Sequence, residues 1–104
     1  MIKQEEYPLK ISTTAQKLLD NGDVDMAATY FWFAAEKFVS AEKWSEAAQN
    51  YEKTGYCYDL EGLWGKAKDA YHKAAEIYKK IGELAQAALM QSQIKIIEKN
   101  MVKY

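Results

Sequence analysis

The chain is poor in the residues that form disulfide bonds, tight turns and bidentate hydrogen bonds to anions. Its 104 residues include one Cys, one Pro, five Gly and one His, and all fourteen basic residues are Lys. A single Cys cannot form an internal disulfide, which excludes a disulfide-stapled scaffold and fits a reducing compartment. So few Pro and Gly residues leave little room for linkers or for the repeated turns of a β-sandwich. Without Arg, the chain lacks the planar donor that most often binds phosphate and carboxylate groups.

Charge and hydrophobicity are ordinary for one globular domain. The net charge is −1, with 49% hydrophobic and 28% charged residues, so no strong field attracts nucleic acid or an anionic membrane. No apolar run is long enough for a signal peptide or a membrane-spanning helix. We therefore expect a single domain over residues 1–104 with a frayed segment at residues 1–7, a cytoplasmic location, and neither nucleic-acid nor membrane partners.

What the chain does contain is a pattern of small and large residues that returns every twenty residues. The four copies are Val24, Ala27, Phe31, Ala34 and Phe38; then Trp44, Ala47, Tyr51, Thr54 and Tyr58; then Trp64, Ala67, Tyr71, Ala74 and Tyr78; and last Leu84, Ala87, Gln91, Ile94 and Glu98. Steps of three and four are typical of an amphipathic helix, and a fixed interval is typical of repeat proteins. Alanines at one interval predict that each helix backbone lies close against the next.

The repeats predict five helices separated by short breaks. The expected helices are about Pro8–Asp20, Asp23–Ala41, Lys43–Leu60, Leu63–Ile81 and Glu83–Val102. Breaks of two or three residues force neighbouring helices to run antiparallel, and no segment alternates as a strand would. The fold class is therefore all-α, with hairpins over about residues 8–41 and 43–81 and a capping helix over residues 83–102. Asp23 is expected to cap the second helix.

One stretch carries a recognisable order of small and aromatic residues. Its members are Gly55, Tyr58, Gly62, Trp64, Ala67, Tyr71 and Ala74. This series resembles the signature of the tetratricopeptide repeat (TPR), over one unit at about Ala48–Ile81 and less fully over about Pro8–Ala41. The closing Pro of that signature is missing, and the hairpin period is forty residues instead of thirty-four. The longer helices are similar to those of the SNAP proteins, the adaptors that load a AAA+ ATPase onto SNARE bundles.

The resemblance implies a short right-handed array of helices that binds protein partners. TPR arrays bind peptides on a concave face formed by the first helix of each hairpin. The residues that would face this way are Gln16, Gln49, Glu52, Tyr56 and Asp59. The Lys/Asn clamp that some family members use for a C-terminal carboxylate is absent, and Glu52 and Asp59 are acidic. A basic or polar peptide therefore fits this face better than an acidic one; the alternative is a plain solvated face.

No arrangement of residues points to an enzyme, a cofactor or a metal site. His72 lies on a helix face rich in Lys and is expected to be a solvated surface residue instead of a catalytic base. Cys57 has neither a His nor a second Cys at ligand spacing, so it is expected to fill a small space in the core. The sequence contains no phosphate loop, dinucleotide fingerprint or zinc pattern.

Four consecutive aromatic residues, Tyr30 to Phe33, depart from the repeat. Phe31 is expected in the core, but Trp32 and Phe33 fall at positions that are polar in the other copies. Exposed neighbouring aromatics usually mark an interface, so these two predict self-association or partner docking. The alternative is that Ile2, Tyr7 or the rest of the N-terminal segment covers them.

The function that the sequence favours is a non-enzymatic protein–protein interaction module, a TPR-like adaptor that binds a peptide or helix or associates with itself. One alternative is a SNAP-like adaptor that couples a partner to a AAA+ ATPase. Another, of a different class, is a helical bundle that binds a small ligand. That alternative would need polar residues at core positions, and those positions are apolar in the sequence.

Overall fold

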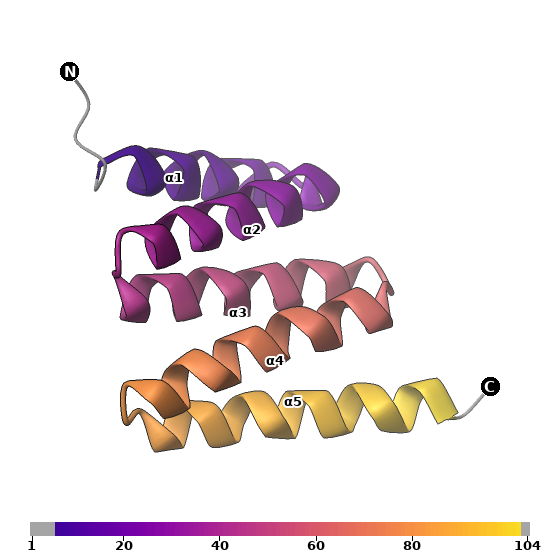
Figure 1. Cartoon of the computed structure of the whole chain (residues 1–104). Coiled ribbons are helices and arrows are strands. Elements are labelled where there is room, and N and C mark those ends of the chain that lie inside the picture. The colour runs from indigo at the N-terminus through magenta and orange to yellow at the C-terminus, as the bar shows by residue number, and fades with distance from the viewer. Residues whose placement is uncertain (1–5, 103–104) are drawn as a thin grey trace.

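The computed structural model describes residues 6–102, which form five α-helices. The helices are α1 (Glu6–Asp20), α2 (Val24–Ser40), α3 (Trp44–Leu60), α4 (Trp64–Lys80) and α5 (Leu84–Val102). Figure 1 shows them laid side by side in chain order, each antiparallel to the next, from α1 at one end to α5 at the other. Each helix packs chiefly on the helices that precede and follow it in sequence. The fold is the all-α array that the repeats predict.

The predicted helix boundaries are confirmed to within one or two residues. The expectation of a frayed segment at residues 1–7 stays a prediction, although Glu6 and Tyr7 belong to the first turn of α1. Pro8 is buried in that turn, where a helix needs no N–H donor. Residues 1–5 lie outside the described residues. Asp23 stands directly before α2 as expected, but its side chain makes no capping hydrogen bond.

Four turns of one geometry connect the helices. Each contains one residue with positive φ, at positions twenty apart: Gly22 (86°), Glu42 (59°), Gly62 (73°) and Gly82 (79°). Two backbone hydrogen bonds close each helix end. In the first turn, Asp23 N donates to Leu18 O at 2.8 Å and Gly22 N donates to Leu19 O at 3.0 Å. This left-handed ending satisfies the last carbonyls of the helix and reverses the chain. Equal turns keep successive helices in the same register.

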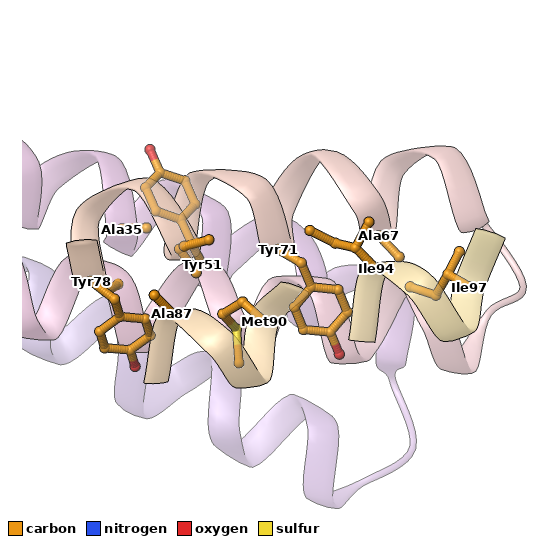
Figure 2. Packing of buried hydrophobic residues seen from close by; sticks show 12 residues of the cluster. Ala35, Tyr51, Ala67, Tyr71, Tyr78, Ala87, Met90, Ile94 and Ile97 are labelled. Atoms are coloured by element: carbon orange, nitrogen blue, oxygen red, sulfur yellow. The ribbon is translucent and has the colours of Figure 1, made fainter. Parts of the chain in front are cut away.

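Small residues line the contacts between helices, as the repeats predict. Ala27, Ala47, Ala67 and Ala87 are all buried. One close approach lies at Gly55 on α3, where an added Cβ would meet Tyr71 Cε1 at 2.9 Å. The ring of Tyr71 therefore packs directly on the α3 backbone. Figure 2 shows Tyr71 and Tyr78 of α4 beside the apolar face of α5, which carries Ala87, Met90, Ile94 and Ile97.

The side of α5 that would face a further helix is polar. At the equivalent positions on α3, forty residues earlier, the side chains pack on α4. The replacements on α5 are Gln91 for Tyr51, Lys95 for Gly55 and Glu98 for Tyr58. Lys68 Nζ on α4 also pairs with Glu98 Oε2 at 3.1 Å. A terminal repeat needs a hydrated outer face, so these polar side chains are compatible with the capping role expected for residues 83–102, which stays a prediction.

Two polar side chains are buried on α3, where the sequence predicts an apolar core. Asn50 accepts a hydrogen bond from Ser12 Oγ at 2.9 Å and donates to Glu46 O at 2.8 Å. Thr54 donates to Asn50 O at 2.7 Å. Within residues 6–102, every fully buried side-chain polar atom has a hydrogen-bond partner. Asn50 therefore joins α1 to α3, Thr54 bonds within α3, and neither leaves a polar group aimed at a buried ligand.

Candidate partner-binding site

A hollow of about 390 Å³ opens between α3 and the start of α5. It is lined by Ser45, Gln49, Glu52, Lys53, Tyr78, Glu83 and Gln86. Tyr78 extends from α4 beneath the hollow and donates a hydrogen bond from its Oη to Glu52 Oε1 at 2.9 Å. Burial raises the pKa of Tyr78, and the hydrogen bond to Glu52 raises it further. Tyr78 therefore stays a neutral donor at physiological pH and holds the Glu52 carboxylate in place.

Both charge signs face the hollow, with acidic groups in excess. Glu52 and Glu83 supply two carboxylates, and Lys53 supplies one ammonium group. Lys53 Nζ donates to Gln16 Oε1 on α1 at 3.5 Å, so the lysine leans toward the neighbouring helix. Gln49 and Gln86 add side-chain amides from opposite walls. The hollow thus offers carboxylates and amides to a ligand that carries hydrogen-bond donors or positive charge.

The structure brings together three of the five residues expected on a concave face. Gln49 and Glu52 line the hollow, and Gln16 joins it through the contact with Lys53. Tyr56 and Asp59 continue along α3 beyond the hollow. Tyr56 is 50% exposed, whereas Asp59 is half-buried and its charge, after burial, raises the pKa of Tyr71.

α5 adds an apolar wall, made by two residues that the sequence analysis did not name. Leu89 and Ile96 are exposed and lie forty residues after Gln49 and Tyr56 of α3. The two helices share one register, because Ala47 and Ala87 are both buried. Leu89 and Ile96 therefore occupy on α5 the face that Gln49 and Tyr56 occupy on α3. The side of the array that holds the hollow combines acidic and amide groups on α3 with apolar groups on α5.

Sequence reasoning missed the residues that other elements bring to the hollow. Tyr78 was expected only as a core residue, and Glu83 and Gln86 carried no signal, because their role depends on where α5 lies relative to α3. Lys53 and Ser45 could have been found, since they lie one turn along α3 from Gln49 and on its exposed side.

The aromatic pair Trp32 and Phe33 divides into one packed residue and one exposed residue. Trp32 is half-buried against the core and meets Tyr51 edge-on, with ring centroids 5.1 Å apart. Lys73 Nζ lies 5.5 Å from the Trp32 ring centroid. The expectation that Trp32 lies on a hydrated face is therefore confirmed only in part, because α3 and α4 pack against one side of the ring while the rest lines a small hollow with Tyr58, Lys66 and Asp69. Phe33 is 43% exposed, as expected, and Tyr7, one of its proposed covers, is itself exposed; Ile2, the other, lies outside the described residues.

The two side chains that the sequence analysis considered for catalysis, Cys57 and His72, lie in different surroundings. Cys57 is fully buried, and burial, followed by the charge of Glu61, raises its pKa to about 11, so the thiol stays protonated. His72 is exposed on α4, as predicted. In residues 6–102, no three His, Cys, Asp or Glu side chains lie close enough together to hold a metal ion. Over the same range, no helix is both long and apolar enough to cross a membrane.

Comparison with known proteins identifies the repeat. The TPR domain of FLU from Arabidopsis, known from a crystal structure, superposes with a TM-score of 0.59 at 17% sequence identity, covering 94% of this chain and 99% of that domain. At this identity the likeness concerns the fold alone, which is a TPR-like array. No curated protein sequence matches the chain. The family described as soluble NSF attachment protein, SNAP, matches residues 11–103. This chain therefore belongs to the SNAP family, whose TPR-like repeats are typically protein-interaction modules and are generally non-catalytic.

Proposed function

We propose that this chain is an adaptor that binds an extended or helical segment of a partner protein in the hollow between α3 and α5. The observation that carries the proposal is the Glu52 carboxylate, half-buried at the hollow and held by Tyr78 Oη at 2.9 Å. A preformed acceptor costs little conformational entropy when a ligand binds. The adjoining Glu83 makes this region acidic. The segment that fits carries a Lys or Arg side chain.

The partner segment also carries an apolar side chain on the side that faces α5. Leu89 and Ile96 are exposed on α5, more than one helical turn after Glu83 in the chain. Apolar contact supplies affinity that does not depend on salt, whereas the Lys or Arg side chain fixes orientation against Glu52 and Glu83. The proposed motif is therefore a basic residue separated from an apolar residue by a few positions.

Selection from a random peptide library displayed on phage tests this proposal. Peptides that bind the full chain should be enriched in Lys or Arg together with Leu, Ile or Phe. Glu52→Gln keeps the acceptor for Tyr78 Oη but removes the charge. It should weaken a selected peptide about threefold to fivefold, and adding Glu83→Gln should weaken it further. Glu76→Gln, on the exposed face of α4 outside the hollow, is the matched control and should leave affinity unchanged.

Three results would count against peptide binding in the hollow. These are enrichment of acidic peptides, equal affinity for Glu52→Gln and the control, and the absence of any peptide that binds. Leu89→Ser tests the apolar wall separately, because it should weaken a selected peptide without changing the salt dependence of binding.

A second proposal, the coupling of a partner to a AAA+ ATPase, is supported by the match to the SNAP family. Co-sedimentation of the chain with hexameric NSF tests it directly. Co-sedimentation that persists in Glu52→Gln would assign the ATPase contact to another surface and leave the hollow between α3 and α5 for the partner segment. Loss of co-sedimentation in that variant would mean that the ATPase itself binds at the hollow. No co-sedimentation with wild-type chain would reject ATPase coupling and leave peptide binding to be judged by the library.

A further inference from the structure

Charged groups of both signs face the hollow between α3 and α5, and they do not neutralise one another. Glu52, Glu83 and Lys53 all belong to its lining. Within residues 6–102, none of the three forms an ion pair. Glu52 instead accepts a hydrogen bond from the Tyr78 hydroxyl, and Lys53 donates to the neutral amide of Gln16. The capacity of these groups to form ion pairs is therefore left for a ligand.

The lysine and the carboxylates lie on different sides of α3. Positions 52 and 53 are successive on the helix, so their side chains leave it about 100° apart around its axis. Glu52 faces the following hairpin, where it meets Tyr78 of α4. Lys53 faces the preceding helices, because its Nζ donates to Gln16 of α1 at 3.5 Å and lies 5.5 Å from the ring centroid of Phe31 on α2. The α1 side of the hollow is thus positive.

Glu83 extends the negative side of the hollow. It directly precedes α5, and its backbone N donates to Tyr78 O at 2.8 Å in the turn from α4. In the array, α3 lies between α1 and α5 (Figure 1). A segment that crosses the hollow from α1 to α5 therefore meets an ammonium group first, then two carboxylates, and last the exposed Leu89 and Ile96 of α5. This order of charge and hydrophobicity favours a ligand whose side chains follow a matching order.

Gln16 keeps the Lys53 ammonium group on the α1 side. The Nε2 group of Gln16 donates to Asp20 Oδ1 at 3.0 Å, one turn along α1, which leaves its Oε1 to accept from Lys53. That second hydrogen bond is long at 3.5 Å, so it is weak and a charged acceptor can replace it. A lysine ammonium group also has three donors. Lys53 can therefore bind a carboxylate without leaving the α1 side.

We propose that the partner segment carries an acidic side chain that binds Lys53, placed on the side of its basic residue away from its apolar residue. This inference rests on the proposed function, because it adds a third element to the same motif. From α1 to α5, the order along the segment is acidic, basic, apolar. A segment with the acidic and basic positions exchanged would set like charges together at both sites. Lys53 therefore disfavours the wrong order as well as favouring the right one.

Fluorescence anisotropy of labelled peptides with the full chain tests the third element. The peptide is the tightest one from the library, synthesised with Glu, Gln or Lys at each of the three positions next to its basic residue on the side away from its apolar residue. At one of these positions, Glu should bind about twofold to fivefold more tightly than Gln, and Lys should bind more weakly than Gln. The preference should shrink as the NaCl concentration rises from about 50 mM to about 500 mM.

Charge exchange tests whether Lys53 is the group that recognises this position. Lys53→Gln should abolish the difference between the Glu and Gln peptides, and Lys53→Glu should reverse it, so that the Lys peptide binds best. Lys10→Glu is the matched control, because it changes the net charge by the same amount and should keep the wild-type preference. Lys10 is exposed on α1, forty residues before Asn50. Asn50 faces α1 from α3, so Lys10 at the equivalent place on α1 faces away from α3.

The outcomes separate this inference from the proposed function. Equal binding of the Glu, Gln and Lys peptides at all three positions would overturn it, as would a wild-type preference in Lys53→Glu. If those peptides still bind more weakly to Glu52→Gln, the proposed function stands without the third element. A library that yields no peptide, or only peptides indifferent to Glu52→Gln, rejects both. Circular dichroism reports whether each variant is helical, and Lys53→Gln alone decides the matter if Lys53→Glu does not fold.

Discussion

At Gly55, the absence of a side chain sets the distance between α3 and α4. The ring of the buried Tyr71 lies so close that a Cβ at position 55 would sit 2.9–3.0 Å from three of its carbons. We predict that Gly55→Ala lowers the free energy of unfolding by about 1–2 kcal/mol. The loss of a flexible glycine favours the helix by up to about 1 kcal/mol, but overpacking against the buried Tyr71 ring outweighs this gain.

Gly65 provides the control for that prediction. It lies in the first turn of α4, with no other atom within 4 Å of an added Cβ. Gly65→Ala should therefore raise the free energy of unfolding by about 0.5–1 kcal/mol, as measured by urea denaturation. Equal effects at both sites would mean that the Tyr71 ring moves to make room for the added Cβ, and that Gly55 is an ordinary helix position.

Glu42 occupies a backbone position that the other three turns give to glycine. Its φ is 59°, in the left-handed region that costs a residue with a Cβ about 1–2 kcal/mol. We predict that Glu42→Gly raises the free energy of unfolding by about 0.5–1 kcal/mol, the greater freedom of glycine in the unfolded chain offsetting part of the relief. Gly62→Ala should lower the free energy of unfolding, because the equivalent position of that turn then gains a Cβ. A loss of stability in Glu42→Gly would contradict this account.

At the scale of single residues, the sequence predicted the core better than the surface. The alanines at intervals of twenty, Cys57 and His72 all lie where the pattern placed them. Trp32 does so only in part, although its equivalent on α4, His72, is exposed. Trp32 packs on both helices of the following hairpin, α3 and α4, whereas only α5 follows α4 within the described residues. A comparison between repeats cannot distinguish an inner position from one at the end.

At the scale of helices, α3 and α4 are joined by three matched pairs of a ring and an ammonium group. Lys66 Nζ lies 5.6 Å from the Tyr58 centroid, Lys73 Nζ 5.8 Å from that of Tyr51, and Lys80 Nζ 3.8 Å from that of Trp44. Each series advances by seven residues, in opposite directions along antiparallel helices. The lysine side chains thus reach over the faces of these rings, of which Tyr58 and Trp44 are half-buried and Tyr51 is buried.

The Lys80–Trp44 pair should contribute measurably to stability because it is the shortest of the three. We predict that Lys80→Gln lowers the free energy of unfolding by about 0.5–1 kcal/mol. Lys79→Gln, in the same last turn of α4 and equally close to the helix C-terminus, controls for the helix dipole and should have a smaller effect. Urea denaturation of both variants measures the difference, and equal losses would show that the ring contact contributes nothing.

Helix boundaries followed from the sequence because each break carries the same turn. The residues four positions before Ala27, Ala47, Ala67 and Ala87 accept the first helical hydrogen bond, whether they are Asp, Lys, Leu or Glu. Asp23 therefore needs no capping contact from its side chain, since the Schellman-type turn already fixes the chain. The candidate site was only partly predictable. Gln49 and Glu52 could be assigned from the exposed side of α3, but Tyr78 and Glu83 required the placement of α5.

At the scale of the whole molecule, the array buries several tyrosines whose ionisation would oppose folding. Burial raises the pKa of Tyr71, with further contributions from Asp59 and Glu52; burial and then the hydrogen bond to Glu52 raise the pKa of Tyr78. In the unfolded chain, tyrosine releases its proton near pH 10. Above that pH the unfolded state binds fewer protons than the folded state, so the free energy of unfolding must fall as pH rises.

We predict that the free energy of unfolding is insensitive to these tyrosines below about pH 10 and then falls by about 1.4 kcal/mol per pH unit for each of the two. Cys57 begins the decline earlier, between its ordinary pKa of 9.0 and its raised value of about 11. Urea denaturation at intervals from pH 8 to pH 11.5 measures the profile. Tyr78→Phe should be less stable than the wild type at pH 8, because Glu52 loses its hydrogen bond. Its stability should nevertheless fall less steeply above pH 10, because one ionising group is gone. Parallel slopes for the two proteins would show that Tyr78 releases its proton as readily in the folded array as in the unfolded chain.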